Sequence, residues 1–313
     1  RYKTSMLKIY QQTIKKSVNF EGVGLHTGKK SNIKILPGKV DEGIIFKRID
    51  LPEHNIVQAS YKNVTSAKLC TTLENEQGVK VSTVEHLLAA LYIAEIDNAI
   101  IEIDNEEIPI MDGSAKEFLK TLRYSEIKIL NKKRKYLEIL EKIELSDGKR
   151  KISIEPSKQS FQVDFQLSYE NKVIGNQKNC VNFQSDNLDD IKESRTFCLF
   201  EDIEKIKKAG LAKGGSLENA IVVEKDKVLN KDGLRNNKEF VNHKILDLVG
   251  DFILSGGRVL GKVTCVQGGH ELTNTFLRKI FTSKNAYKSA ELEDIILKKN
   301  TRTNSPIGLV VNA

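Results

Sequence analysis

Two helix-like segments that are similar to each other place the strongest constraint on how this 313-residue chain can fold. The segments VEHLLAAL at 84–91 and VNHKILDL at 241–248 share Val, His and Leu at the same three places. Each precedes a strand-like segment by a similar distance, NAIIEID at 98–104 and RVLGKVTCVQ at 258–267. Three matches in eight positions can arise by chance, but the common order of helix and strand favours a duplicated α+β unit.

A duplication would relate His86 to His243 by a pseudo-twofold axis, with the two rings facing each other across a domain interface. A prior of roughly 150 residues per domain also gives two domains, each large enough to bury its own core. The stretch LNKKRKY at 130–136 separates the halves as a linker or a first exposed strand. The run KKRK also fits a nuclear-localisation signal, but such short basic runs often match by chance. We therefore expect an α+β fold with domains at 6–130 and 137–313 and a linker at 131–136.

Local signals predict where several elements begin. In KVSTVEHLLAALYIA a short strand becomes a helix that Ser82 or Thr83 can cap, with Glu85 close behind as in a capping box. In MDGSAKEFLKTL the Asp-Gly pair turns the chain and Ser114 starts a helix. In the second half KISIEP and FQVDFQL alternate like strands, and a final helix begins at about residue 271.

The composition is that of an ordinary globular chain with a modest basic excess. Hydrophobic residues make up 39% and charged residues 29%. The net charge of +8 can attract nucleic acid, a nucleotide-linked small molecule or an anionic membrane surface. A solvated Lys-rich surface without a partner is the simpler interpretation. Nucleic acid is disfavoured because the chain lacks an RNP-like aromatic motif, zinc-knuckle spacing and an Arg-rich arm.

The cysteines and apolar runs predict a cytoplasmic protein. The four cysteines are scattered and form no CxxC pair, so reduced thiols fit better than a structural zinc knuckle. The first residues, RYKTSMLKIYQQ, lack an apolar h-region, and the run LLAALYIA at 87–94 is too short to cross a bilayer. We expect a soluble, non-exported chain without stable membrane insertion. Arg1–Ser5 precede the first Met, and the first domain is expected to begin at that residue.

The segment VNHKILDLVGDFI carries His243, Asp247 and Asp251 at intervals of four, on one stripe of a helix. A His–Asp pair at this spacing is usually a surface contact that contributes a few tenths of a kcal/mol. That interpretation is weakened here because apolar residues border the stripe, and an unpaired charge among them would be costly to bury. A metal ion would remove that cost.

Two imidazoles and one carboxylate supply three ligands and leave a fourth tetrahedral position for water, the pattern of catalytic zinc. His86, His243 and Asp247 satisfy this pattern, although no HExxH motif joins them. Glu85 is adjacent to His86, and a carboxylate that accepts a proton from a metal-activated water completes a hydrolytic site. The alternative role of Glu85 is to cap its helix, and the two roles do not exclude each other.

His270 follows two glycines at the end of a strand, where a side chain can be presented at a cleft. Asp251, one turn beyond Asp247, can accept a hydrogen bond from His270 and keep it positively charged. A charged imidazole there would stabilise a developing oxyanion and then protonate a leaving amine. From these residues alone, a loop histidine without a function is the favoured alternative.

Several longer blocks together resemble one enzyme family. They are FEGVGLHTG at 20–28, STVEHLLAAL at 82–91, EIPIMDGSA at 107–115, SRTF at 194–197, GLAKGGSLENA at 210–220 and FVNHKILDLVGD at 240–251. In one register from about residue 8 to the C-terminus, they are similar to the UDP-3-O-acyl-N-acetylglucosamine deacetylases, zinc enzymes of early lipid A synthesis in Gram-negative bacteria. The resemblance implies two similar α+β domains, each a sheet layered against helices, with the active site between them.

The resemblance also implies a role for each candidate residue. The implied metal and acid–base residues are the Zn²⁺ ligands His86, His243 and Asp247, the general base Glu85, and the cationic acid His270 supported by Asp251. Thr196, in SRTF, corresponds to a hydroxyl that donates to the tetrahedral oxyanion. Lys244 corresponds to a lysine that meets the nucleotide-sugar portion of the substrate, and Phe197 to an aromatic residue of the nucleotide site.

An insert around 205–223 resembles the element that forms a hydrophobic passage for the fatty acyl chain. Gly215 and Ser216 lie in this passage block and are expected to contact the substrate. Leu69 and Cys70, in KLCTT, correspond to a second insert that lines the site.

Together these features predict hydrolysis of the 2-N-acetyl group of a UDP-linked, 3-O-acylated glucosamine, which releases acetate. We expect a Zn²⁺-dependent monomer with this small-molecule substrate, no nucleic-acid partner and at most a peripheral membrane contact. His26 is expected to support the substrate site, and His54 is assigned to the surface. Two rivals stay open: a nucleic-acid binder with steeply salt-dependent affinity, and a nucleotide-sugar binding module that needs no metal.

Overall fold

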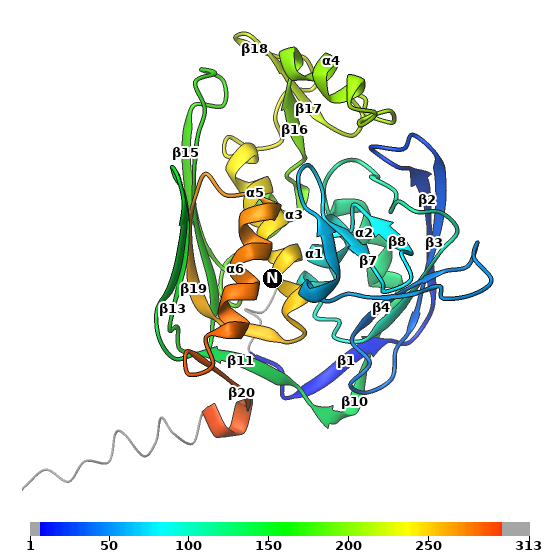
Figure 1. Ribbon diagram of the computed structural model, residues 1–313, viewed down its shortest axis with the longest axis vertical. Helices are drawn as coiled ribbons and strands as arrows, with labels where there is room; N and C mark the ends of the chain where they lie inside the picture. The colour runs from blue at the N-terminus through cyan, green and yellow to red at the C-terminus, as the bar shows by residue number, and fades with distance from the viewer. Residues whose placement is uncertain (1–6, 296–313) are drawn as a thin grey trace, which may run out of the picture.

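The computed structural model describes residues 7–295, and two mixed sheets form its outer layers with helices between them (Figure 1). In spatial order, the sheet of the N-terminal half contains β2 (Val18–Val23), β3 (Lys30–Pro37), β9 (Ala99–Ile103), β4 (Ile44–Arg48) and β5 (Ile56–Gln58). The sheet of the C-terminal half contains β12 (Ile143–Asp147), β13 (Arg150–Glu155), β19 (Arg258–Val266), β14 (Phe161–Ser168) and β15 (Asn176–Asn182). This second sheet is extended by β11 (Lys135–Ile139), which pairs with the first residues of β19 and with β20 (Tyr287–Glu291).

The two sheets share one topology. The central strand β9 pairs antiparallel with β3 and parallel with β4, and the central strand β19 pairs antiparallel with β13 and parallel with β14. The outer strands β2, β5, β12 and β15 all pair antiparallel with their neighbours. The expected pair of similar α+β units is therefore confirmed at the level of strand order and direction.

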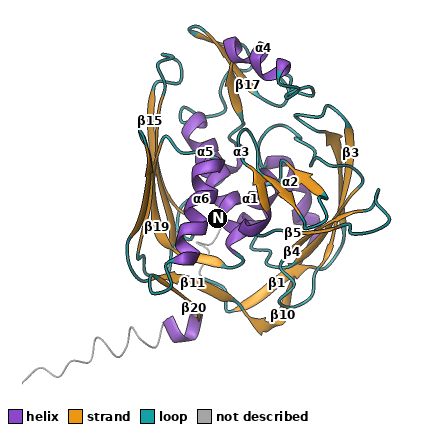
Figure 2. Ribbon diagram, in the orientation of Figure 1, coloured by secondary structure: helices purple, strands orange, loops and turns teal. Residues whose placement is uncertain are grey.

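Most of the helices lie between the two main sheets, as Figure 2 shows in purple, whereas the helix at 200–208 lies outside this space at the top of the view. The longer ones are α1 (Glu85–Ile93), α2 (Lys116–Leu122), α4 (Phe200–Lys208), α5 (Glu239–Phe252) and α6 (His270–Thr282), and α3 (Asp189–Glu193) is a short helix beside α5. Single 3-10 turns occur at Tyr61–Asn63, Arg123–Ser125 and Ile253–Ser255. In each half one helix precedes the central strand and one follows it, so α1 corresponds to α5 and α2 to α6.

Three small sheets complete the described fold. One contains β6 (Val64–Ser66), β7 (Thr72–Glu74) and β8 (Lys80–Ser82), and another contains β16 (Phe197–Leu199), β17 (Ile221–Glu224) and β18 (Lys227–Val228). In the sequence, the first of these inserts lies between β5 and α1, and the second lies between β15 and α5. The third is the pair β1 (Tyr10–Ile14) and β10 (Ile127–Lys133).

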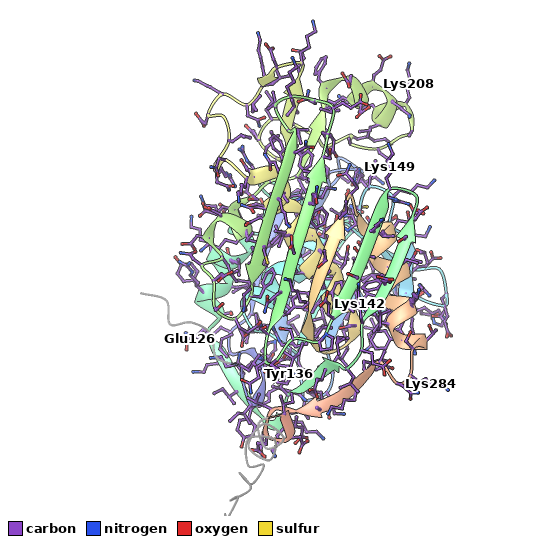
Figure 3. The ribbon with its side chains drawn as sticks, turned by 90° about the vertical axis from the view of Figure 1, so that its left-hand side faces the viewer. Glu126, Tyr136, Lys142, Lys149, Lys208 and Lys284 are labelled. Atoms are coloured by element: carbon purple, nitrogen blue, oxygen red, sulfur yellow. The ribbon has the colours of Figure 1, made fainter. Side chains whose placement is uncertain are left out.

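The C-terminal sheet buries one face against the helices. Along β14, Phe161, Val163 and Phe165 are buried, and the residues between them are more exposed, as the period of two in a half-buried strand requires. Figure 3 turns the outer face of this sheet toward the viewer, with Lys149 at the turn between β12 and β13. Most of the buried apolar side chains of both halves form one continuous cluster through the central helices, and Tyr136, Leu260 and Leu292 form a second, smaller cluster.

The start of α1 differs from the sequence prediction. Val84 is the residue before the first helical turn, and within the described chain no side chain caps this end. The Thr83 hydroxyl donates instead to Glu107 Oε2 at 2.7 Å, and Thr83 has a φ of 58°. A β-branched residue with positive φ is strained by about 1–3 kcal/mol. The predicted cap is wrong because a tertiary hydrogen bond takes its hydroxyl, and α2 likewise begins at Lys116 rather than at Ser114.

Buried charges tie the end of α1 to the C-terminal half. The Arg134 side chain is 2% exposed and donates to Asp97 Oδ2 at 2.9 Å and to Glu95 Oε2 at 3.1 Å. Arg258 donates to Asp97 Oδ1 at 3.2 Å, and its guanidinium lies 4.5 Å from the centroid of the Tyr92 ring. Each charge has a partner of opposite sign, which a buried charge requires.

We propose that the two similar units are separate domains with a boundary near 131–136. These residues are the end of β10, Arg134 and the start of β11, so the stretch expected to be a linker is mostly strand. The outer ends of the expected domains, residue 6 and residues 296–313, lie outside the described residues. Arg1–Ser5 also lie outside them.

Two further sequence predictions concern thiols and membranes. All the cysteines are free, in agreement with the expected reduced state. Among the helices within residues 7–295, none combines the length and the hydropathy that are needed to cross a bilayer.

Candidate metal and catalytic site

The crossing of α1 and α5 brings His86, His243 and Asp247 together. The two imidazole centroids are 4.8 Å apart, so the histidines face each other as the duplication predicted. Asp247 Oδ1 lies 3.1 Å from His86 Nε2 and 3.3 Å from His243 Nε2. All three residues are buried, and their ligand atoms lie within 4.8 Å of one another. This is a donor set that can hold one metal ion.

The helices approach closely at this point because α5 carries a glycine. A Cβ atom on Gly250 would lie 2.1 Å from the carbonyl oxygen of Glu85, far inside van der Waals contact. Any side chain at this position would push α1 away from α5. Gly250 therefore allows the first turn of α1, with Glu85 and His86, to lie against the stripe of α5.

The protonation of His243 fits a cation beside Asp247. His243 Nδ1 lies 2.9 Å from the Ser194 carbonyl oxygen, which can only accept, so Nδ1 carries a proton. Burial lowers the pKa of His243 although Asp247 is adjacent, which favours the neutral ring. The neutral ring then turns the Nε2 lone pair toward an oxygen of Asp247. His243 Nε2 and Asp247 Oδ1 are then two acceptor atoms close enough to bind one cation, so the residues fit a bound metal.

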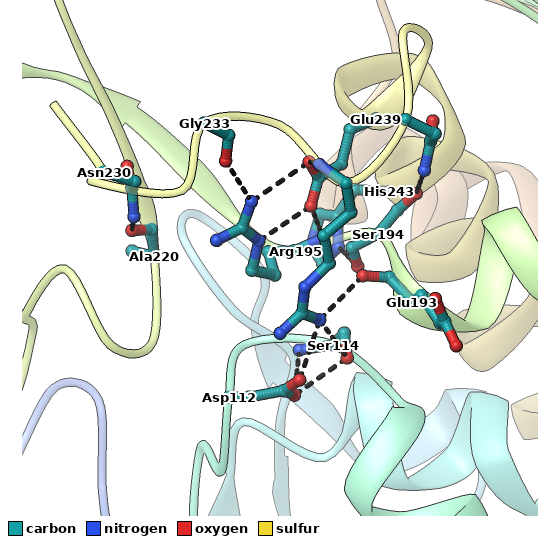
Figure 4. A network of polar contacts seen from close by, with 12 residues as sticks. Asp112, Ser114, Glu193, Ser194, Arg195, Ala220, Asn230, Gly233, Glu239 and His243 are labelled. Atoms are coloured by element: carbon teal, nitrogen blue, oxygen red, sulfur yellow. Dashed lines mark hydrogen bonds and ion pairs between the residues drawn. The ribbon is translucent and has the colours of Figure 1, made fainter. Parts of the chain in front are cut away.

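A second network holds the Ser194 carbonyl in place (Figure 4). Arg235 Nη1 donates to Asp112 Oδ2 at 2.8 Å and to the Glu193 carbonyl at 2.9 Å, which joins the two halves. Beside it, Arg195 Nε donates to Glu239 Oε1 at 2.8 Å. Partners of this kind orient a metal-binding histidine through its second nitrogen.

Glu239 was missed in the sequence, although a signal was present. Residues 239, 243, 247 and 251 all follow one another at intervals of four, so Glu239 continues the stripe of α5 by one turn. Its side chain is 0% exposed. Glu107 was also missed: its buried carboxylate accepts from the backbone N–H groups of His26 and Thr27. A loop glutamate carries no sequence signal of such burial.

His270, Asp251 and Glu85 form a second cluster against the first. His270 begins α6, and its Nδ1 lies 2.5 Å from Asp251 Oδ2, which is the predicted contact. Its Nε2 lies 3.5 Å from Glu85 Oε1 and 3.7 Å from Asp247 Oδ2. Burial alone would lower the pKa of His270, but Asp251, Glu85 and Asp247 raise it to about 10. His270 is thus a cation that points at Glu85 and at the metal-type cluster.

Glu85 and Asp247, the two carboxylates near His270 Nε2, have pKa values that are shifted in opposite directions. Burial raises the pKa of Glu85, and the positive charges of His270 and His86 offset this only in part. Burial would also raise the pKa of Asp247, but His243, when its ring is protonated, and the cationic His270 hold that pKa well below its usual range. A carboxylate pushed toward neutrality beside one held ionised is the pattern of a proton acceptor next to a charged ligand.

Some of the candidate substrate residues lie beside this site, and others lie away from it. A small cleft is lined by Lys244 together with Asp247, Asp251 and His270. The Lys244 ammonium lies 5.7 Å from the centroid of the Phe197 ring, so Phe197 is a neighbour of Lys244.

Cys70 and Leu69 lie in the loop before β7. Burial, and then the charge of Glu85, raise the pKa of the Cys70 thiol to about 12, so the thiol stays protonated. Leu69 is 48% exposed. Thr196 is half-buried beside Gly113, and within residues 7–295 it makes no hydrogen bond to the His86–His243–Asp247 cluster.

Gly215, Ser216 and His26 lie together in a region away from the His86–His243–Asp247 cluster. The loop 210–216 packs on the turn between β2 and β3, where the Ala212 N–H donates to His26 Nδ1 at 3.2 Å and the Lys213 N–H donates to the His26 carbonyl at 3.2 Å. Gly215 and Ser216 follow in the same loop. The structure therefore connects His26 to the predicted passage segment rather than to the catalytic cluster. His54 is on the surface, as predicted.

The fold and the site together define a class of protein: a duplicated α+β chain with a buried His–His–Asp metal-type site and an adjacent carboxylate–imidazole pair. The UDP-3-O-acyl N-acetylglycosamine deacetylase (LpxC) family model matches residues 11–282. The chain belongs to this family.

Named relatives are similar in sequence to this chain over nearly its whole length. The chain is 38% identical to the UDP-3-O-acyl-N-acetylglucosamine deacetylase of Geotalea uraniireducens (strain Rf4), over 96% of each sequence. It is 38% identical to that of Pseudoalteromonas translucida (strain TAC 125), over 91% of this chain and 95% of the relative. With the protein of the same name from Shewanella baltica (strain OS155 / ATCC BAA-1091), identity is 40% over 91% and 94%.

Proposed function

We propose that His86, His243 and Asp247 hold Zn²⁺ and that Glu85 and His270 move the protons of a deacetylation. As a member of its family, the chain is a hydrolase that removes the N-acetyl group of UDP-3-O-acyl-N-acetylglucosamine, a step of lipid A biosynthesis. The observation that carries the zinc proposal is the convergence of His86 Nε2 and His243 Nε2 on Asp247 Oδ1, at 3.1 and 3.3 Å, within a buried donor set. Two imidazoles and a carboxylate with an open fourth position suit catalytic zinc.

The bound metal would polarise the amide carbonyl and lower the pKa of the attacking water. Glu85 accepts the proton of that water, and burial raises the pKa of Glu85, which favours its protonated form after the transfer. His270 stays protonated through Asp251, stabilises the oxyanion and then donates its Nε2 proton to the departing nitrogen. Thr196 is proposed as a further donor to the oxyanion. Acetate and a free 2-amino group are the products.

The substrate is a small molecule with a charged and an apolar end. Lys244, above the Phe197 ring, is proposed to meet the nucleotide-sugar portion. Gly215 and Ser216 in the 210–216 loop, with Leu69 and Cys70, are proposed to contact the acyl chain. His26 is proposed to support this region because it holds Ala212 of the passage loop.

We also propose a cytoplasmic monomer that acts without nucleic acid, without stable membrane insertion and with at most a peripheral membrane contact. Both histidines and the aspartate of the candidate site come from a single chain, so the site needs no second copy. Free thiols throughout the described chain support a reducing compartment.

Metal analysis joined to an activity assay tests the proposal. The purified protein is stripped with a chelator, titrated with Zn²⁺, and assayed for acetate release from UDP-3-O-acyl-N-acetylglucosamine. We expect one tightly bound zinc per chain, loss of activity in the stripped protein and recovery on zinc addition. The His86→Ala variant is expected to lose the tight zinc site, and an unchanged zinc affinity in that variant would contradict the ligand assignment.

A further inference from the structure

Thr71 contacts two carboxylates of the candidate site, those of Glu85 and Asp251. It lies just before β7 in the N-terminal half and is 2% exposed. Its hydroxyl donates to Asp251 Oδ1 at 2.6 Å, and its backbone N–H donates to Glu85 Oε2 at 3.1 Å. One residue therefore bonds to a carboxylate of α1 and to a carboxylate of α5.

The contact with Asp251 fixes how that carboxylate is turned. Asp251 Oδ2 faces His270 Nδ1, and Oδ1 accepts from Thr71, so each oxygen has its own donor. Asp251 is 3% exposed, and water has little access to replace either donor. Without the Thr71 hydroxyl, Oδ1 would be a buried acceptor with no partner, and the carboxylate would rotate to find one. Rotation of Asp251 would move the His270 ring that it holds.

The contact with Glu85 fixes the other side of the reaction. Glu85 Oε2 accepts from the Thr71 N–H, while Oε1 lies 3.5 Å from His270 Nε2. Thr71 thus sets the orientation of the proton acceptor through its backbone and of the proton donor through its hydroxyl. Glu85 and His270 act on the same amide one after the other, so the distance between them affects the rate.

We propose that Thr71 is a positioning residue for the deacetylation, which keeps Glu85 and the Asp251–His270 pair in a fixed relative orientation. This inference rests on the proposed roles of Glu85 and His270. The hydroxyl acts through Asp251 and touches neither the metal ligands nor the reacting atoms. Loss of the hydroxyl lowers the rate of the chemical step and leaves substrate binding unchanged.

The test compares Thr71→Val, which removes the hydroxyl and keeps the shape, with Thr71→Ser, which keeps the hydroxyl. For zinc-loaded Thr71→Val we expect kcat to fall about 10- to 100-fold, the usual effect of removing an outer-shell partner, with KM unchanged. Thr71→Ser restores most of the rate. Thr71→Ala removes the same hydroxyl and replaces Thr71→Val if that variant does not fold.

Thr13→Val is the matched control, because Thr13 is a buried threonine far from the site whose hydroxyl donates to the Asn98 carbonyl at 2.6 Å. It is expected to lower the melting temperature and to leave kcat unchanged. Zinc content is measured in every variant and is expected to stay at the parent level. Equal kcat in Thr71→Val and Thr71→Ser would overturn the proposal.

Two further readouts separate this proposal from the one on which it rests. In a background of Asp251→Asn, adding Thr71→Val is expected to cost little more, because both changes act through one carboxylate. In metal-free protein with ¹⁵N-labelled histidine rings, the His270 Nδ1 proton resonance is expected to shift in Thr71→Val and not in Thr71→Ser. If Asp251→Asn retains the parent kcat, the proposed acid role fails. If Asp251→Asn loses activity and Thr71→Val does not, the Thr71 proposal alone fails.

Discussion

The two halves share one topology and differ in the side chains that α1 and α5 present to each other. His86 and His243 occupy the same place on the two helices, and their rings meet. Four and eight residues further on, α5 carries Asp247 and Asp251, whereas the corresponding positions after His86 hold Ala90 and Ala94. The duplicated frame thus supplies a symmetric pair of imidazoles, and substitutions on one helix supply the carboxylates.

The residue before each histidine shows the reverse difference. Glu85 precedes His86 and points toward His270, whereas Asn242 precedes His243 and bonds to Asn179 of the outer sheet at 2.7 Å. A carboxylate therefore occurs once at this pair of positions. The two halves therefore divide the proposed chemistry, with the proposed base and one proposed metal ligand on α1 and the other proposed ligands on α5.

Asp247→Ala makes α5 equal to α1 at this position and is expected to have the largest effect. A metal contributes several kcal/mol of transition-state stabilisation, so the loss corresponds to about 1000-fold or more in kcat/KM. Acetate release and zinc content are measured together. Ala90→Ser on α1 is the control and should bind zinc as the parent does. Parent-level zinc content and activity in Asp247→Ala would break the comparison.

Arg134→Met tests whether the buried ion pairs hold the two halves together. Asp97 and Glu95 would lose a buried cationic partner, which is expected to cost about 3–5 kcal/mol of unfolding free energy. Denaturant unfolding measures this loss. Arg150→Met, which removes an exposed pair with Asp147, is the control and should cost about 1 kcal/mol or less. Equal losses in the two variants would show that the buried ion pairs contribute no more to the unfolding free energy than an exposed pair does.

Gly250→Ala tests the close crossing of α1 and α5. The added methyl group would meet the Glu85 carbonyl, whereas α1 carries Ile93 at the corresponding position. Overpacking of this kind costs about 1–3 kcal/mol, and the shift of Glu85 should lower kcat as well. Thermal unfolding and activity are compared with those of Gly257→Ala, whose methyl group would lie 3.2 Å from the flexible Leu137 side chain and 3.5 Å from the Lys135 carbonyl oxygen. A Gly250→Ala variant with parent stability and kcat would argue against the crossing.

His26 is expected to give the smallest effect, on the contact between the β2–β3 turn and the 210–216 loop. Burial lowers the pKa of His26, although Glu107 opposes this, so the folded state favours the neutral ring. The stabilisation is therefore complete above about pH 6.5, the pKa of an unfolded histidine, and is lost as pH falls below it. His26→Gln should flatten the fall in stability between about pH 7 and 5. The exposed control His54→Gln should leave the slope unchanged.

The spacing of apolar and polar residues in the sequence is enough to predict many of the strands and helices. The segments that became β13, β14, α5 and β19 carry a clear period of two or of four, and the shared histidine position predicted the meeting of α1 and α5. The strands β16 and β18 were not predicted, because strands of three and two residues are too short to show a period.

The site was less predictable where the contacts are long-range. The hydrogen bond between Thr71 and Asp251 joins residues 180 positions apart, and no local pattern reports it. Thr83 has the composition of a helix cap, but Glu107 lies close enough to take its hydroxyl. In both cases the fold decides which of several possible partners a polar side chain finds.

A crystal structure of the zinc-soaked protein, with anomalous scattering recorded at the zinc edge, tests most directly whether both halves supply metal ligands. The account predicts one strong peak about 2.0–2.2 Å from Nε2 of His86, Nε2 of His243 and a carboxylate oxygen of Asp247, with ligands from both halves. A sole peak bound by Glu85 and His270, with the His86 and His243 rings free of metal, would contradict it.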